Sequence, residues 1–139
     1  MHTSKGFTLI ELLMSIAIIA ILSTLILSGL SSARGRSNDS KIKSQLTSLR
    51  TAAENYHESA GTFGSASDCS SGMFATSELN MSTYTTEASY PAETHLTCNA
   101  NGADYAVSAN LTGGGGYWCV DARGSKYLAA DPGDVVICP

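Results

Sequence analysis

Charged residues are scarce in this sequence. They make up 14% of its 139 residues, and the formal net charge at pH 7 is -4. A nucleic-acid-binding domain carries a basic patch or stripe, so this composition argues against duplex DNA as the main partner. No phosphate-binding loop, paired-carboxylate motif or Ser/His/Asp set can be placed, and His2, His57 and His95 share no metal-ligand spacing. We therefore predict a protein that is not an enzyme and needs no cofactor.

The cysteines lack the tight C-x-x-C spacing of a zinc site. All four lie well beyond the apolar amino-terminal run: Cys69, Cys98, Cys119 and Cys138. An even number of widely spaced cysteines in a small region predicts two disulfides, and therefore an oxidising compartment outside the cytoplasm. Four cysteines allow three pairings, and their spacing does not decide among them.

Carboxylates near the carboxy terminus are the remaining candidates for a metal site. Asp121, Asp131 and Asp134 could supply oxygen ligands to calcium. Aspartate is also frequent in turns, and we favour that interpretation. The sequence therefore predicts no metal.

One long run, residues 7–30, is almost entirely apolar, with Glu11 as its only charged residue. As a helix it would be roughly 36 Å long, which exceeds the ~30 Å hydrocarbon core of a bilayer. The apolar core of a cleaved secretory signal is shorter, about 7–15 residues. We therefore predict a membrane-spanning helix that stays on the protein.

The basic residues and the cysteines predict opposite orientations. Arg34, Arg36, Lys41 and Lys43 follow the apolar run, whereas only Lys5 precedes it. The positive-inside rule would place these four on the cytoplasmic side. Disulfides require the opposite side, so we favour a cytoplasmic amino terminus and a carboxy-terminal part outside.

Residues 31–60 continue the helix as an amphipathic segment. Steps of four, three, four and three residues place one set of apolar side chains on a single helical face, and these are Ile42, Leu46, Leu49, Ala53 and Tyr56. Residues 61–139 should form a globular part, with an irregular region over 61–102 and a β-meander over 103–139. Strands are expected at 103–111, 117–121, 126–128 and 135–138. The predicted fold is α+β, a long amino-terminal helix packed on a small, disulfide-stabilised antiparallel sheet.

The residues Lys5-Gly6-Phe7-Thr8-Leu9-Ile10-Glu11-Leu12-Leu13 resemble the class III signal of type IV pilins and pseudopilins. The resemblance implies that residues 1–6 are a leader, that prepilin peptidase cuts after Gly6, and that Phe7 is then methylated. It also implies that Glu11 attracts the freed amino group of a neighbouring subunit. A carboxylate inside an apolar span costs about 2.5–3.5 kcal/mol on insertion scales and is normally paired, which agrees with that role.

The resemblance further implies partners, cysteine pairs and a location. The partners would be copies of the chain itself, other pilins, prepilin peptidase and the assembly machinery in the membrane. Disulfide-bounded regions of pilins favour the pairs Cys69–Cys98 and Cys119–Cys138. The expected product is a surface filament for adhesion, motility or DNA uptake. Two alternatives stay open: a pseudopilin of a type II secretion system, and a membrane-anchored ligand-binding module that does not polymerise.

Overall fold

A computed structural model of the chain describes residues 6–139, so residues 1–5 of the predicted leader lie outside the described residues. One long helix, α1 (Leu9–Ala60), supplies residues to two compact units. The first unit ends at Arg34, and the second, called the head below, comprises Gly35–Pro139.

Within the first unit, α1 pairs several of its few polar side chains with its own backbone. The hydroxyls of Ser15, Ser23 and Thr24 donate hydrogen bonds of 2.7–2.8 Å to carbonyl oxygens three or four residues earlier. A buried hydroxyl without a partner is costly in an apolar medium. These bonds therefore make the polar residues of this stretch compatible with lipid or with a packed helix interface.

Within the head, α1 buries the predicted apolar stripe. Ile42, Leu46, Leu49 and Ala53 are fully buried, and Tyr56 is partly buried against them. Full burial of an aliphatic side chain stabilises a fold by about 1.5–3 kcal/mol. The amphipathic half of α1 is therefore part of the hydrophobic core of the head.

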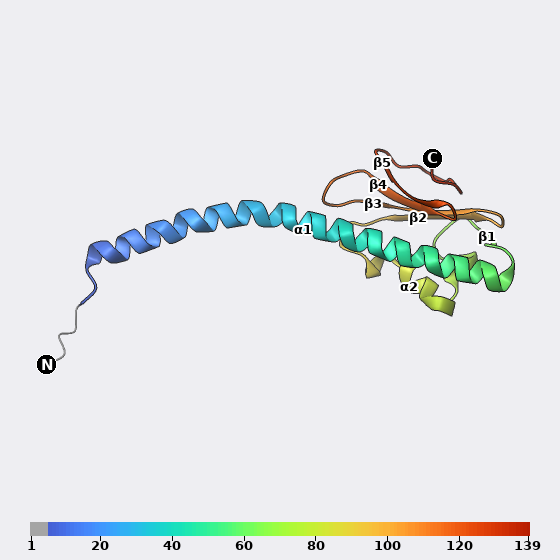
Figure 1. Cartoon of the computed structure of the whole chain (residues 1–139), viewed down its shortest axis with the longest axis horizontal. Helices are drawn as coiled ribbons and strands as arrows, with labels where there is room; N and C mark the ends of the chain where they lie inside the picture. Colours follow the sequence, from blue (N-terminus) through green and yellow to red (C-terminus); the bar gives the residue numbers. More distant parts are fainter. Residues whose placement is uncertain (1–5) are drawn as a thin grey trace. The chain divides into compact units, whose positions relative to one another are not determined.

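A five-stranded antiparallel sheet covers one side of this part of α1 (Figure 1). The strands follow the chain order, each paired with the next: β1 (Ser65–Ala66), β2 (Leu96–Asn101), β3 (Tyr105–Asn110), β4 (Tyr117–Asp121) and β5 (Gly124–Leu128). Short helical segments lie on the other side of α1: η1 (Gly72–Ala75), η2 (Glu78–Asn80), α2 (Met81–Thr85) and η3 (Glu87–Ser89). The predicted fold class, a long helix followed by a small antiparallel sheet, is confirmed.

The central strand β3 is buried on both faces. Tyr105, Val107 and Ala109 belong to the core cluster shared with α1, whereas Ala106 and Ser108 are buried on the opposite face. Alternation of apolar and polar residues, as in this strand, is typical of a strand with only one buried face. Both faces are covered because the carboxy-terminal segment is tied back to the sheet through the disulfide between Cys138 and Cys119, which is the β4 partner of Ser108.

Two details of the predicted secondary structure need correction. Residues 61–102, expected to be irregular, contain β1, β2 and the short helices. β2 alternates Leu96, Cys98 and Ala100 with polar residues, but its small and polar side chains give a weak strand signal. No strand forms over residues 135–138, because the Cys138 N–H donates 2.9 Å to the Asp121 carboxylate instead of to a neighbouring strand.

A pair of glycines lets α1 and the loop between β3 and β4 touch through their backbones. A Cβ atom built on Gly113 would lie 2.1 Å from the Gly35 carbonyl carbon. Beside this contact, the Gly113 N–H donates 2.9 Å to the nearly buried carboxylate of Asp39. The contact thus joins the beginning of the head's helix to the sheet.

We expect Gly113→Ala to lower the free energy of unfolding of the head by about 1–3 kcal/mol, because backbone atoms must move to admit the methyl group. Chemical denaturation followed by circular dichroism measures the change. Gly114→Ala is the matched control, since its Cβ would meet only the Asp39 side chain, at 3.4 Å. Equal stability of the two variants would contradict the close-contact explanation.

Candidate functional site

The amino terminus of α1 is closed by a hydrogen-bonded pair of side chains. Glu11 Oε2 accepts from the Thr8 N–H at 2.9 Å and from the Thr8 hydroxyl at 2.7 Å. In return, the Glu11 N–H donates to Thr8 Oγ1 at 3.4 Å. This reciprocal arrangement is a capping box, which satisfies backbone donors that a helix leaves unpaired at its first turn.

Glu11 therefore has a local role that our sequence reasoning missed. The signal was present, since Thr-x-x-Glu before an apolar run is the sequence pattern of a capping box. Only Oε2 is used in it, and Glu11 Oε1 accepts no hydrogen bond from any residue in the range 6–139. The carboxylate can therefore hold Thr8 and accept a further donor at the same time.

Gly6 and Phe7 precede the helix. Both are exposed, and residues 6–8 have no regular secondary structure. The peptide bond between Gly6 and Phe7 thus lies in non-helical chain, the form in which a backbone can enter a protease active site without prior unwinding.

From Phe7 to Leu30, each large apolar side chain whose burial is described is at least 45% exposed. The stretch is long and apolar enough to cross a membrane, and the residues of its most apolar window are not buried within the chain. A surface of this size exceeds the few hundred square ångströms of contiguous apolar patch usual on soluble monomers. It is a surface for lipid or for other apolar helices.

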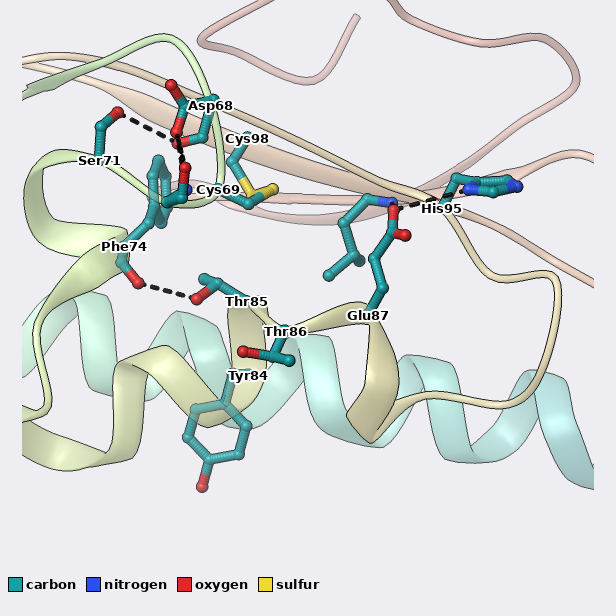
Figure 2. The surroundings of a disulfide bond; sticks show 12 residues. Asp68, Cys69, Ser71, Phe74, Tyr84, Thr85, Thr86, Glu87, His95 and Cys98 are labelled. Carbon is teal, nitrogen blue, oxygen red and sulfur yellow. Dashed lines mark hydrogen bonds and ion pairs between the residues drawn. A yellow bond between two sulfur atoms is a disulfide. The ribbon is translucent and has the colours of Figure 1, made fainter.

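In the head, one disulfide joins Cys69 to Cys98 on the face of the sheet that packs on α1 (Figure 2). Next to it, the Ser70 hydroxyl and N–H both donate 2.7 Å to Asp68, which lowers the pKa of that carboxyl. The buried Thr85 hydroxyl donates 2.8 Å to the Phe74 carbonyl. These bonds fix the segment between α1 and β2.

A groove beside this disulfide is lined by four hydroxyl side chains, Ser70, Ser82, Thr85 and Thr86. Its other lining residues are Cys69, Phe74 and Ala75. Its hydroxyls are largely occupied by the chain itself. Thr86, for example, donates 2.6 Å to the Ser82 carbonyl, and Ser70 donates to Asp68. This arrangement stabilises the segment and gives no catalytic set.

The second disulfide joins Cys119 to Cys138 on the opposite face of the sheet. Asp121, two residues after Cys119 on that face, is 5% exposed. Its Oδ1 accepts the N–H groups of Arg123 and Gly124 at 2.8 Å, and its Oδ2 accepts that of Cys138 at 2.9 Å. Asp121 therefore closes the turn between β4 and β5 and holds the carboxy-terminal segment.

The Asp121 carboxylate thus accepts hydrogen bonds from backbone N–H groups on both oxygens. Asp131 accepts the Gly133 N–H at 2.9 Å in a local turn. Within residues 6–139, no group of three or more His, Cys, Asp or Glu side chains is placed to hold a metal ion. Asp134 belongs to no such group either. Asp121 and Asp131 therefore hold turns and loops of the head.

Two buried tyrosines complete the polar features of the core. The Tyr90 hydroxyl donates 2.7 Å to the Tyr84 carbonyl. Burial raises the pKa of both Tyr90 and Tyr105 above the ordinary tyrosine value. Both tyrosines are part of the hydrophobic core cluster.

The amino-terminal region is similar to that of known proteins. The family model of the prokaryotic N-terminal methylation motif matches residues 1–27. The type IV wide pilus major component PilA4 of Thermus thermophilus is 52% identical over 46 residues, which are 33% of this chain and 35% of that protein. The match thus spans about a third of the relative's length, and no solved structure matches the chain. The chain therefore carries the prokaryotic N-terminal methylation motif and resembles a type IV pilin over about a third of its length, and it combines a long helix with a small disulfide-bonded sheet.

Proposed function

We propose that the chain is a structural subunit of a type IV pilus, which polymerises through the first half of α1 into a surface filament. The observation that carries the proposal is the exposed apolar stretch from Phe7 to Leu30. Such a helix is stable in lipid before assembly and against the same stretch of other copies afterwards. Packing between apolar helices with small residues drives that exchange.

Cleavage and methylation of the chain would take place at the start of the same region. Prepilin peptidase would cut the exposed, non-helical bond after Gly6, and methylation would follow on the new amino group of Phe7. Glu11 then pairs with the amino group of the neighbouring subunit through Oε1, while Oε2 keeps the capping box. Two opposite charges inside an apolar bundle attract each other strongly because the medium screens them little.

The proposed topology places the amino terminus of the uncut chain in the cytoplasm and the head outside. The two disulfides of the head support an external position of the head, because disulfides persist in oxidising compartments. The proposed partners are copies of the chain, other pilins, prepilin peptidase and the membrane-bound assembly machinery. Adhesion, motility and DNA uptake are the roles proposed for the filament.

Intact-mass analysis of the chain in a sheared cell-surface filament fraction tests the proposal. We expect a mature chain that begins at a methylated Phe7 and gains four hydrogens on reduction. If the processed chain is found only in the membrane, the pilus subunit hypothesis is wrong and the chain is a secretion pseudopilin or a non-polymerising anchored module. A chain that is uncut after Gly6 would overturn the proposal entirely.

A further inference from the structure

The turn between β2 and β3 contains an asparagine followed directly by a glycine, Asn101-Gly102, and no other asparagine of the chain has this neighbour. Asn101 is the last residue of β2 and is exposed. Glycine has no side chain, so nothing on Gly102 shields its own backbone nitrogen. The nitrogen of a following residue can attack the amide carbon of an asparagine side chain, and here that attack meets the least steric hindrance.

The Gly102 N–H is not engaged in the hydrogen bonds of this turn. The turn is closed by the Asn101 N–H, which donates 3.0 Å to the Asp104 carbonyl oxygen. Within residues 6–139, the Gly102 N–H donates no hydrogen bond to a backbone or side-chain acceptor. The nitrogen can therefore lose its proton and attack without first breaking a hydrogen bond.

The turn also polarises the side-chain amide of Asn101. Its Oδ1 accepts the N–H of Ala103 at 3.1 Å and the N–H of Asp104 at 2.8 Å. These bonds bend the side chain back over its own backbone, as asparagine does in turns. When a nucleophile adds to the amide carbon, negative charge develops on this same oxygen. Backbone donors already aimed at such an oxygen stabilise the transition state, so the turn favours the attack.

We propose that Asn101 is a site of spontaneous deamidation in the folded head. The Gly102 nitrogen bonds to Cγ of Asn101, the bond from Cγ to Nδ2 breaks, and the Gly102 amide proton leaves with Nδ2 as ammonia. Water then opens the resulting succinimide ring: its hydroxyl adds to one of the two ring carbonyl carbons, and its remaining proton returns to the Gly102 nitrogen. The reaction needs the head alone and is independent of assembly into a filament.

The two ring carbonyls lead to two products. Opening at Cγ gives aspartate, whereas opening at the former main-chain carbonyl gives isoaspartate, whose main chain runs through the side-chain carbon and is one methylene longer. The Gly102 carbonyl oxygen accepts the Phe63 N–H at 3.0 Å, and Ser65 of β1 pairs with Asn101. A longer main chain at this position displaces both partners. Isoaspartate therefore loosens the attachment of residues 62–66 to β2.

Incubation of the purified full chain in heavy-oxygen water, followed by reduction, digestion and peptide mass spectrometry, tests the proposal. Mildly alkaline pH is used, because the attacking nitrogen has to lose its proton. The peptide that contains Asn101 should lose ammonia, gain an oxygen from the solvent, and separate into an aspartate and an isoaspartate form. Digestion in ordinary water ensures that the heavy oxygen marks only the conversion that took place during the incubation.

Asn110 is the matched control within the same chain. Its Oδ1 also accepts a backbone N–H, from His95 at 2.6 Å, but the Leu111 N–H that follows it donates 2.8 Å to the Gly116 carbonyl oxygen. We expect Asn101 to convert on the order of tenfold faster than Asn110, because the Leu111 hydrogen bond has to break before its nitrogen can attack. Equal rates would overturn the proposal. So would an Asn101 amide that survives in the folded protein while the reduced, denatured chain loses it.

The variant Asn101→Asp separates the added charge from the longer main chain. It reproduces the aspartate product, whose carboxylate can still accept the N–H groups of Ala103 and Asp104. In aged wild-type protein that contains isoaspartate, the Phe63 N–H should exchange with solvent severalfold faster than in fresh protein, whereas the variant should protect it as fresh protein does. Equal protection of the Phe63 N–H in all three samples would overturn the inferred loosening of residues 62–66.

Discussion

Glu11→Ala should reduce filament yield on the order of 100-fold while the chain remains in the membrane. Without the carboxylate, the amino group of the neighbouring subunit has no counter-charge in an apolar bundle. An unpaired charge there costs about 2.5–3.5 kcal/mol, and each 1.4 kcal/mol is a factor of ten in an equilibrium constant. Quantifying the chain in sheared filaments relative to the total cellular chain measures the effect.

Two further variants separate the charge of Glu11 from its capping role. Glutamine can replace glutamate in a capping box, so Glu11→Gln keeps the bonds to Thr8 and loses the charge. It should fail like Glu11→Ala. Thr8→Ala loses a cap worth about 0.5–2 kcal/mol and keeps the charge, so it should assemble better than either Glu11 variant. If Glu11→Gln assembles normally and Thr8→Ala does not, Glu11 acts only as a cap.

Removing the Cys69–Cys98 disulfide should destabilise the head more than removing Cys119–Cys138. The sequence separations are 29 and 19 residues. Loop-closure entropy gives about 3.6 and about 3.3 kcal/mol for loops of these sizes, a difference too small to decide the order. Packing decides it, because Cys98 and Cys69 pack in the core cluster that also holds Met73 and Phe74, whereas the equally buried Cys119 is not part of that cluster. Cys119–Cys138 closes the other face, where Asp121 independently holds Cys138.

Thermal and chemical unfolding of Cys69→Ala/Cys98→Ala and of Cys119→Ala/Cys138→Ala tests this order. Losses in the range of about 2–5 kcal/mol are expected for a small disulfide-bonded domain, with the first variant at the upper end. The double replacement of each pair avoids a free thiol and isolates one bridge at a time. A greater loss for the Cys119–Cys138 pair would show that the carboxy-terminal segment, and not the segment before β2, controls the stability of the head.

The regular features of the fold could be predicted because each has a local pattern in the chain. The apolar run is recognisable by its length alone, whereas the stripe from Ile42 to Ala53 and the alternation in β3 follow the periods of 3.6 and 2 residues that helices and strands impose. β2 was missed because alanine and asparagine, which fill three of its six positions, are depleted in strands and give a weak strand signal. Val135 to Cys138 looked like a strand by composition, but a strand also needs a neighbour, and the composition of a segment does not supply one.

The sequence by itself determined the family motif around Gly6, Phe7 and Glu11, the apolar stretch and the number of cysteines, because each depends on residues adjacent in the chain. The spacing of the cysteines allows three pairings, and the pairs that the resemblance favoured form because the sheet brings Cys98 to Cys69 and Cys138 to Cys119. Only the tertiary structure decided that Asp121 binds backbone N–H groups and that Leu79 and Tyr127 stay exposed. These properties depend on residues far apart in the chain, whose distances are set by the packing of the whole head.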